Sequence, residues 1–337
     1  MKYVTIKDIA RYLMLSVSTV SRALTGDKNI RKETKEMVLE AAQKLGYKPN
    51  PVATNLKYGR TNTIGVIVPE MVTPFASQVI EGIQEVLYVR GLKVIIAQSN
   101  ENSGRERENL RLMESFRVDG IIICLSHYEE NKQEYVRLQD KGIPMVFYDR
   151  IPVGLDVPKV IVDDYLKSFF LVEHLIRSGW RRIVHLQGPS YIYNSAERFR
   201  GYKDALEKFK IPYEEALVIK TGMSIEDGRQ AAYCLLKGNI PFDSVYAFTD
   251  TQAIGAMNYL REQHVRIPEE VAVAGFSGTI LSTIVYPQLT TVEQPLEEMG
   301  RTAAELILEK IVNPSGDNRT IVLDAEIRFR TSTEKFF

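Results

Sequence analysis

The chain of 337 residues is long enough for two or three domains, and its 43 basic residues balance its 43 acidic ones. No apolar run approaches the roughly 18 residues of a membrane span, and the N-terminus lacks the charged start, apolar middle and small-residue cleavage site of a secretion signal. These features exclude a membrane protein and predict a cytoplasmic one.

The charge is unevenly distributed along the chain. Residues 1–60 hold 12 lysines and arginines against 5 acidic residues, a net charge of +7 that leaves −7 for the remainder. A basic end on an acidic body favours contact with a polyanion at that end and predicts an affinity that falls steeply with salt. A solvated helical surface can carry the same excess of basic residues. The charge alone therefore does not distinguish such a surface from a polyanion-binding one, and the sequence motifs have to decide.

The first predicted elements are two short helices within residues 5–24, joined by a tight turn. Thr5 followed by Asp8 has the form of a helix-starting capping box, and a second helix begins after Ser16. The apolar stripes that face each other are Ile6, Ile9, Ala10 and Leu13 on the first helix and Val20, Ala23 and Leu24 on the second. The outward face of the second helix carries Val17, Ser18, Ser21 and Arg22. This is the usual geometry of a helix-turn-helix unit that places its second helix in the DNA major groove, and an ordinary pair of packed helices is the alternative.

A third helical pattern runs from Lys32 to Leu45 and stops at Gly46, where a glycine can take the left-handed conformation that ends helices. This completes a three-helix head. The segment Pro49–Lys57 follows, in which Asn50 can cap a very short helix. Because a segment this short does not form a stable helix on its own, we expect a plain linker there in the free protein.

From Thr63 onward, apolar strands alternate with amphipathic helices. The first series of strands is Ile64–Pro69, Lys93–Ala97, Gly120–Cys124 and Pro144–Asp149. The second series is Arg182–Leu186, Ala216–Ile219, Ser244–Phe248 and Val271–Phe276. Near-continuous apolar strands belong to parallel sheets with flanking helices on both faces. Two such sheets predict an α/β unit of two lobes with a cleft between them, and ligands of open parallel sheets bind beyond the carboxyl ends of the strands.

The sequence contains no pattern for metal binding or catalysis. Cys124 and Cys234 are in apolar settings without histidine or cysteine at ligand spacing, so we interpret both as reduced core residues. The histidines are scattered and form no triad: His127, His174, His185 and His264. There is also no Gly-x-Gly-x-x-Gly loop, no phosphate-binding Lys-Ser/Thr loop and no nucleophile elbow. We therefore expect no cofactor and no metal, and an enzyme with Asp149 or Asp163 as its catalytic group is the weaker alternative.

Taken together, these residues resemble the lactose-repressor (LacI/GalR) family of bacterial transcription regulators nearly from end to end. The motifs that carry the resemblance are Val4–Ala10, Ser16–Leu24, Leu45–Pro51, Thr63–Pro69, Val118–Ile122, Gly201-Tyr202, Asp250 with Ala253–Ala256, and Pro287–Pro295. Any one of them could arise by chance, but eight in the family's order could not.

The resemblance implies three parts. Residues 1–48 would form an all-α helix-turn-helix head, and residues 49–61 a hinge segment that becomes helical only on the operator. Residues 62–337 would form an effector-binding and dimerisation domain, shaped like periplasmic sugar-binding proteins, in which the chain crosses between lobes three times. Lobe 1 then contains about residues 62–161 and 292–322, and lobe 2 contains about residues 162–291 and 323–337.

The resemblance also assigns DNA contacts. Val17, Ser18 and Arg22 match the base-reading positions of the family's head, and Leu56 matches the residue that wedges into the minor groove. Such a wedge kinks the duplex at a cost of roughly a few kcal/mol, which a larger wrapped surface recovers. The complete set of expected contacts is Thr5, Ser16, Val17, Ser18, Thr19, Ser21, Arg22, Asn29, Tyr47, Asn50, Ala53 and Leu56.

Two residues of the head depart from the family pattern. Met14 stands at a turn position where the family usually has glycine or asparagine, so we expect a strained connection. Arg31 replaces a serine that commonly caps the third helix, which costs on the order of 1 kcal/mol unless Thr34 or another group substitutes.

For the two lobes, the resemblance points to an effector site between them. Arg198 matches the arginine that grips the effector, with an inter-lobe salt bridge as the alternative role. Many members carry an aspartate where this chain has Ser277, and losing that anion while Arg198 and Arg150 remain favours a negatively charged ligand. We therefore hypothesise a sugar acid or sugar phosphate over a neutral sugar. The expected effector contacts are Phe75, Asp149, Arg150, Asp163, Arg198, Thr249 and Ser277. Asp250 is expected to cap the next helix.

These expectations combine into a sequence-specific DNA-binding regulator, a repressor in the commoner outcome of the family, under allosteric control by a small carbohydrate derivative. Its expected partners are a pseudo-palindromic double-stranded DNA operator, the effector and a second copy of the chain. The tail Thr331–Phe337 has no leucine heptads, which favours a homodimer over a zippered tetramer. The alternative is a cytosolic carbohydrate-binding module whose basic head contacts protein or nonspecific nucleic acid.

Overall fold

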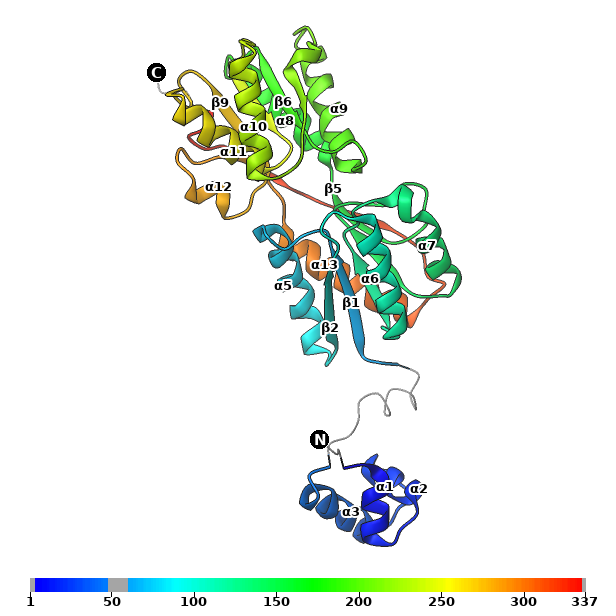
Figure 1. Ribbon diagram of the computed structural model, residues 1–337. Coiled ribbons are helices and arrows are strands. Elements are labelled where there is room, and N and C mark those ends of the chain that lie inside the picture. Colours follow the sequence, from blue (N-terminus) through cyan, green and yellow to red (C-terminus); the bar gives the residue numbers. More distant parts are fainter. Residues whose placement is uncertain (1–3, 48–59, 335–337) are drawn as a thin grey trace. The chain divides into compact units, whose positions relative to one another are not determined.

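The computed structural model describes residues 4–47 and 60–334, which fall into two compact units that divide between Thr61 and Asn62 (Figure 1). The hinge helix expected in the segment Pro49–Lys57 lies outside the described residues, as do the three expected DNA contacts of that segment. Each unit has a hydrophobic core of its own.

The first unit is a three-helix head made of α1 (Ile6–Leu13), α2 (Val17–Leu24) and α3 (Lys32–Lys44). Its core consists of Ile9, Ala10, Val20, Ala23, Val38, Ala41 and Ala42. The expected capping box is present, because the Thr5 backbone N–H and hydroxyl both donate to the Asp8 carboxylate, at 2.9 and 2.7 Å. The Ser16 hydroxyl caps α2 by accepting from the Thr19 backbone N–H at 3.1 Å.

Both departures in the head have the expected structural consequence. Met14 ends α1 with a φ of +54°, the left-handed conformation that costs a residue with a side chain about 1–2 kcal/mol. Its side chain is 93% exposed, so it gains no packing in return. Arg31 stands at the N-cap of α3 and makes no side-chain capping bond to it.

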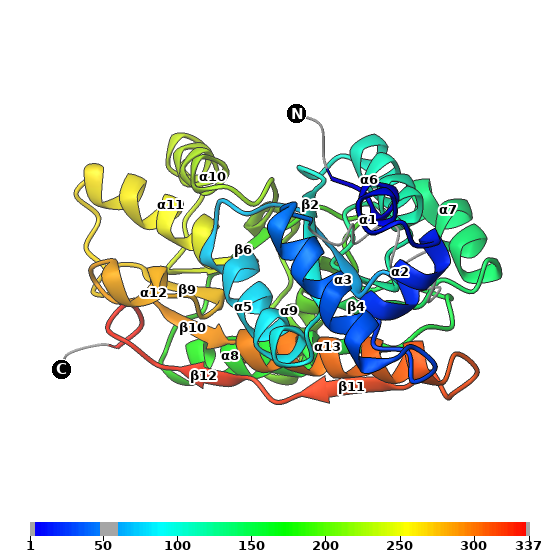
Figure 2. The same cartoon turned by 90° about the horizontal axis from the view of Figure 1, so that it is seen from below.

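The second unit contains two six-stranded sheets, with helices on both faces of each (Figures 1 and 2). The first sheet is fully parallel and has the order β11-β5-β4-β3-β1-β2. Its strands are β1 (Thr63–Val68), β2 (Lys93–Gln98), β3 (Gly120–Ile123), β4 (Met145–Tyr148), β5 (Lys159–Val162) and β11 (Thr320–Leu323). Together with α5 (Pro74–Val89), α6 (Ser103–Ser115), α7 (Tyr128–Asp140) and α13 (Leu296–Val312), it forms the part that we call lobe 1.

The second sheet has the order β12-β10-β9-β8-β6-β7 and is parallel except for the antiparallel edge strand β12. Its strands are β6 (Ile183–Gln187), β7 (Val218–Lys220), β8 (Ser244–Ala247), β9 (Ala272–Ser277), β10 (Thr290–Glu293) and β12 (Glu326–Arg328). The helices of this lobe 2 are α8 (Asp164–Arg177), α9 (Tyr193–Lys208), the 3-10 turn η1 (Glu215–Leu217), α10 (Ile225–Lys237), α11 (Asp250–Glu262) and α12 (Leu281–Ile284). The eight expected strands are all present, whereas β5, β10, β11 and β12 were not anticipated.

The chain passes between the lobes three times: between β5 and α8, between β10 and α13, and between β11 and β12. The second passage begins after Glu293, the last residue of β10. It returns α13 to lobe 1, where the backbones of α13 and α5 touch at two glycines. A Cβ on Gly82 would meet the Glu297 carbonyl oxygen at 2.0 Å, and one on Gly300 would meet the Val79 carbonyl oxygen at 2.0 Å. This close packing fixes α13, from late in the chain, against α5, from early in the chain, within lobe 1.

One expectation about the core is wrong. Cys124 is buried, but Cys234 is exposed, because the buried side of α10 consists of Gly228, Ala231, Ala232 and Leu235.

His185 is fully buried in lobe 2, and burial lowers its pKa to about 4, so it is a neutral core residue. Within residues 4–47 and 60–334, no helix is long and apolar enough to cross a membrane, and no acidic, histidine and cysteine side chains gather as a metal site.

Candidate functional site

The head presents an outward face on α2. Val17 is 46% exposed, and Ser18 and Arg22 are exposed beside it, one helical turn apart. The Arg22 Nε donates to the Ser18 carbonyl oxygen at 3.4 Å, so the guanidinium lies along the helix surface. Val20 and Ala23 on the opposite side are buried in the head. The three expected base-reading residues therefore share one solvent-facing surface.

The remaining expected DNA contacts in the head are spread over several elements. Thr5 and Ser16 both serve as helix caps, and the Ser16 hydroxyl lies 2.8 Å from the hydroxyls of Ser18 and of Thr19. Ser21 is partly exposed on α2. Asn29 is exposed in the loop before α3, and Tyr47 packs partly against the core of the head. Asn50, Ala53 and Leu56 lie outside the described residues.

In lobe 2, the expected effector arginine is held in a fixed position. Arg198 on α9 is 3% exposed, and its Nε donates to the Asp164 carboxylate at 2.7 Å while Nη1 donates to the Phe248 carbonyl oxygen at 2.6 Å. The guanidinium carbon lies 3.5 Å from the ring centroid of Phe276 and 4.5 Å from that of Phe248. Two aromatic rings and two hydrogen bonds therefore define its plane. The salt bridge joins α8 to α9 within lobe 2, not one lobe to the other.

Asp164, the partner of Arg198, was missed by the sequence analysis. It is 5% exposed at the start of α8, directly after the expected site residue Asp163. Burial raises the pKa of Asp164, and the attraction of Arg198 opposes the rise. Asp163 itself is the N-cap of α8, because its carboxylate accepts from the Leu166 backbone N–H at 2.8 Å.

In lobe 1, Asp149 contacts the other lobe. It follows β4 with a φ of +55°, is 8% exposed, and accepts at 3.2 Å from the side-chain amides of Asn194 on α9 and of Gln294 in the second passage. Neither amide was anticipated. Both follow the carboxyl end of a strand, so the rule that ligands gather there could have identified them.

Arg150 is also paired, which corrects the expected charge of the site. Its Nη1 lies 2.8 Å from both carboxylate oxygens of Glu101, and Nη2 lies 3.5 Å from the Met223 sulfur of lobe 2. Since Arg198 is paired with Asp164, the two arginines are not available together as free cations. The electrostatic reason for expecting a sugar acid or sugar phosphate is therefore wrong.

A third contact joins the lobes at the same boundary. The rings of His127 and Tyr191 stack with their centroids 4.1 Å apart, and the His127 Nε2 lies 3.1 Å from the Glu101 carbonyl oxygen. His127 follows β3 in lobe 1, and Tyr191 lies between β6 and α9 in lobe 2. Stacking, a sulfur contact and an amide–carboxylate bond thus bridge the carboxyl ends of the two sheets.

The cap of α11 is Thr249 and not the expected Asp250. Thr249 is the N-cap of α11, and its hydroxyl accepts from the Gln252 backbone N–H at 3.3 Å. Asp250 does not cap the helix but is 2% exposed and accepts from the backbone N–H groups of Gly278 and Thr279, at 2.9 and 3.2 Å, and from the Thr291 hydroxyl at 2.6 Å. It therefore holds the turn that follows β9.

That turn contains Ser277, which is 8% exposed and has a φ of +130°, unusual for a residue with a side chain. Its carbonyl oxygen accepts from the Gln294 backbone N–H at 3.2 Å. Phe75, the last expected contact, is partly buried at the start of α5 and packs against the core of lobe 1. Of the expected residues of the second unit, Asp149 and Arg150 contact lobe 2 directly, and Ser277 is joined to Asp149 through Gln294.

Comparison with known proteins agrees with both units. Residues 5–50 match the bacterial regulatory proteins of the lacI family, and residues 61–333 match the periplasmic binding proteins and sugar binding domain of the LacI family. The chain is 31% identical to catabolite control protein A of Priestia megaterium, over 98% of this chain and 99% of that one. It is also 31% identical to the transcriptional repressor PurR of Vibrio atlanticus, over 98% of both chains.

Two solved structures extend the likeness to the fold. The transcriptional regulator CelR in complex with cellobiose superposes with a TM-score of 0.74 at 30% identity, covering 98% of this chain and 99% of that one. The Lac repressor dimer bound to operator superposes with a TM-score of 0.85 at 24% identity, with the same coverage, and shows the shared fold.

The pairing of Arg198 predicts a large effect of Asp164→Asn. The substitution leaves a buried guanidinium without its carboxylate, which should lower the free energy of unfolding by about 3–5 kcal/mol at pH 8. Urea denaturation measures this loss. Asp163→Asn is the control, since asparagine caps a helix as well as aspartate and should change the value little. Equal effects of the two substitutions would contradict the assigned pairing.

The burial of Asp250 predicts a pH dependence of stability. Burial raises its pKa to about 6, whereas an aspartate in the unfolded chain has a pKa of about 3.9, so the folded state binds this proton more tightly. The stabilisation is fully present below the unfolded pKa and is lost as pH rises through the folded one. The free energy of unfolding of the native chain minus that of Asp250→Asn should therefore fall by about 2–3 kcal/mol between pH 4 and pH 7. Urea denaturation at several pH values measures it, and a difference that rises with pH would show that the ionised carboxylate is the favoured form.

Proposed function

Because the chain belongs to the LacI family of bacterial regulatory proteins, with its helix-turn-helix head and its sugar-binding domain, we propose that it is a sequence-specific transcriptional repressor controlled by a sugar. The observation that carries this proposal is the exposed face of Val17, Ser18 and Arg22 on a head that the family match covers from residue 5 to residue 50. PurR, a relative over nearly the whole length, is a repressor by name.

On DNA, α2 would lie in the major groove, with Arg22 the side chain best suited to a guanine. Its guanidinium can donate two hydrogen bonds to the O6 and N7 atoms of that base. Thr5, Ser16, Thr19, Ser21, Asn29 and Tyr47 would add phosphate contacts or support the helix, and Asn50, Ala53 and Leu56 would act in the minor groove. The +7 charge of the first 60 residues would supply the attraction to phosphates.

In the sensor, we propose that a neutral sugar binds between the lobes. The hydrogen bonds of Arg198 engage Nε and Nη1, and its plane is fixed by two aromatic rings, so the Nη2 edge would meet the ligand's hydroxyls. Asp149 and Asn194 offer an acceptor and an amide nearby, and Ser277 offers a hydroxyl. Since Arg198 and Arg150 are each paired with a carboxylate, no net positive charge favours an anion. The complex of the relative CelR with cellobiose agrees with a neutral ligand.

Ligand binding would act on the contacts that bridge the lobes. A sugar that inserts at Asp149 has to replace or rearrange its bond to Asn194, and this changes the angle at which the lobes meet. Coupling between two sites of a protein is typically worth ~1–3 kcal/mol, or about 5- to 150-fold in affinity. That range suffices to move a repressor on and off its operator.

A second copy of the chain is the proposed third partner. Large apolar side chains are exposed at the end of α5, where Tyr88 is 83% and Val89 is 85% exposed, and around α12, where Ile284 is 70% and Tyr286 is 76% exposed. Burial of such side chains against a second copy is favourable. The Lac repressor, which shares the fold, has been solved as a dimer on its operator. Two heads related by a two-fold axis would read a pseudo-palindromic site.

As a regulator, the chain would act where the chromosome lies, in the cytoplasm of a bacterium. Its relatives are transcriptional regulators, which makes an enzyme unnecessary to explain any feature of the site. We propose that no residue of the inter-lobe boundary is catalytic, and that Asp149 and Asp163 serve ligand binding and helix capping, respectively.

The proposal predicts selective DNA binding with two-fold symmetry. Selection of bound sites from a random duplex pool should yield a pseudo-palindrome, and affinity for it should fall or rise at least fivefold when cellobiose, ribose or another neutral sugar of a panel is added. Fluorescence anisotropy on the selected and a scrambled duplex measures both. Equal binding to the two duplexes would instead support the carbohydrate-binding module with a nonspecific basic head.

The face of α2 predicts a base-specific effect of Arg22→Ala. Loss of a bidentate contact with guanine should cost ~1–3 kcal/mol of operator binding and relax the preference at a single base position. Lys28→Ala, in the loop that follows α2, is the control, since removing an exposed positive charge outside the face of Val17, Ser18 and Arg22 should weaken binding to all sequences alike. A uniform loss in Arg22→Ala would assign Arg22 to the phosphate backbone.

A further inference from the structure

Two of the three passages between the lobes run side by side where they leave and enter the second sheet. β10 ends at Glu293, where the chain leaves for α13, and β12 starts at Glu326, where it arrives from β11. The strands pair antiparallel, with Glu293 opposite Glu326 and Thr291 opposite Arg328. A short piece of sheet therefore joins these two passages to each other.

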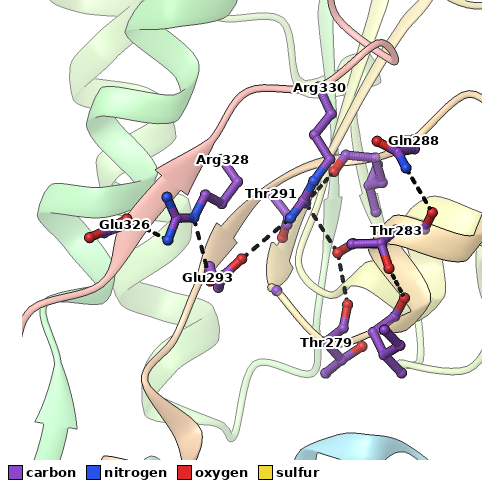
Figure 3. Close-up of polar contacts among 12 residues, drawn as sticks. Thr279, Thr283, Gln288, Thr291, Glu293, Glu326, Arg328 and Arg330 are labelled. Carbon is purple, nitrogen blue, oxygen red and sulfur yellow. Dashed lines mark hydrogen bonds and ion pairs between the residues drawn. The ribbon is translucent and has the colours of Figure 1, made fainter.

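The side chain of Glu293 ties this piece together (Figure 3). One carboxylate oxygen lies 3.4 Å from Nε of Arg328, and the other lies 3.3 Å from Nη2 of Arg330. Arg330 is itself anchored in lobe 2, because its Nη1 donates to the Ser282 hydroxyl at 3.1 Å and to the Leu289 carbonyl oxygen at 2.9 Å. The carboxylate of Glu293, where the chain leaves lobe 2, is thus paired with both Arg328 and Arg330, which lie where the chain returns.

Glu293 also touches the turn that follows β9. A Cβ on Gly278 would lie 2.2 Å from the Cα of Glu293 and 2.6 Å from its Cβ, so the glutamate lies directly on this glycine. Glu293 pairs in register with Ser277, and the next residue, Gln294, donates its backbone N–H to the Ser277 carbonyl oxygen and its side-chain amide to Asp149 of lobe 1. Any shift of the outgoing passage therefore moves the turn at Ser277 and the contact with Asp149 together.

We propose that Glu293 is a positioning residue of the sensor, which holds the two neighbouring passages together and thereby sets the Ser277 turn and the Gln294–Asp149 contact. It does not touch the sugar. This role deepens the proposed function, on which its meaning for regulation rests, but the positioning itself is a property of the free chain.

The partly exposed position of the cluster makes it adjustable. The Glu293 side chain is 36% exposed and that of Arg328 is 49% exposed, whereas Arg330 is 14% exposed. Ion pairs that water reaches are weakened by salt, which leaves buried packing unchanged. Ion pairs between the two passages can bias the angle between the lobes without being essential for folding.

The matched test compares Glu293→Gln with Glu326→Gln. Both remove one charge from the same cluster, but Glu326 is 62% exposed and pairs only with Arg328, two residues away on its own strand, among the described contacts. Hydrogen exchange of the full-length protein should show the backbone N–H groups of Gly278, Thr279 and Gln294 exchanging about fivefold faster in Glu293→Gln, a factor of the size expected from losing the partly exposed ion pairs of Glu293. In Glu326→Gln, their exchange should stay within about twofold of the native rate.

Two further measurements separate positioning from a general loss of stability. In the native protein, about 1 M NaCl should speed exchange at the same three groups, and in Glu293→Gln it should add little, because the ion pairs are already lost. Glu293→Asp keeps the charge and should restore most of the protection. A salt response of equal size in the native protein and in Glu293→Gln would overturn the proposal, as would equal effects of the glutamine and aspartate variants.

The distance between the lobes gives an independent result. Spin labels on the exposed native Cys234 of α10 and on Glu108→Cys of α6 should report a broader distance distribution in Glu293→Gln than in Glu326→Gln. Equal distributions would contradict the positioning role. Neither measurement needs DNA or sugar, so failure of the proposed function, seen as unselective DNA binding or no response to sugars, remains distinct from failure of this inference.

Discussion

The proposed effector site is built around a buried guanidinium that has to be paired. Taking a charge out of water costs several kcal/mol unless a partner and hydrogen bonds replace the solvent, and Arg198 finds these in Asp164, the Phe248 carbonyl oxygen and two aromatic rings. The pairing fixes the orientation of the guanidinium before a ligand arrives and removes most of its attraction for anions. Arg150 is likewise paired, with the carboxylate of Glu101. The chemistry that remains at the boundary is directional hydrogen bonding, which suits hydroxyl groups.

The same boundary carries the contacts that can report binding. Asp149 joins lobe 1 to α9 and to the second passage, and Asp250 holds the Ser277 turn against that passage from the other side. The two carboxylates are not in contact, but Gln294 and Ser277 connect them through one backbone hydrogen bond. A ligand that disturbs Asp149 is therefore linked mechanically to the crossing segments, and the cluster at Glu293 determines how far they can move independently.

The head folds on a separate core and needs none of these contacts. Its seven buried residues are small or branched aliphatic side chains, and its helix starts are held by the Asp8 and Ser16 caps. The strained Met14 and the uncapped start of α3 reduce its stability, which is tolerable for a unit whose outward face is completed by a DNA partner. Regulation in this chain would then act on how two such heads are placed.

The order of elements along the chain was determined by the sequence, because the spacing of apolar residues and the cap at Thr5 are local properties. The eight strands with continuous apolar runs and the outward residues of α2 were predictable for the same reason. The short strands β5, β10, β11 and β12 were not, since strands of three or four residues carry little apolar signal. Only the tertiary structure decided that Thr249 caps α11 while Asp250 holds a distant turn, and that Arg150 and Arg198 are each paired with a carboxylate. It also decided that Asn194 and Gln294 contact Asp149 and that Asp164 contacts Arg198. Those facts depend on which side chains meet across long separations in the chain, and the pairing of buried charges is settled by that proximity and not by the residues' own preferences.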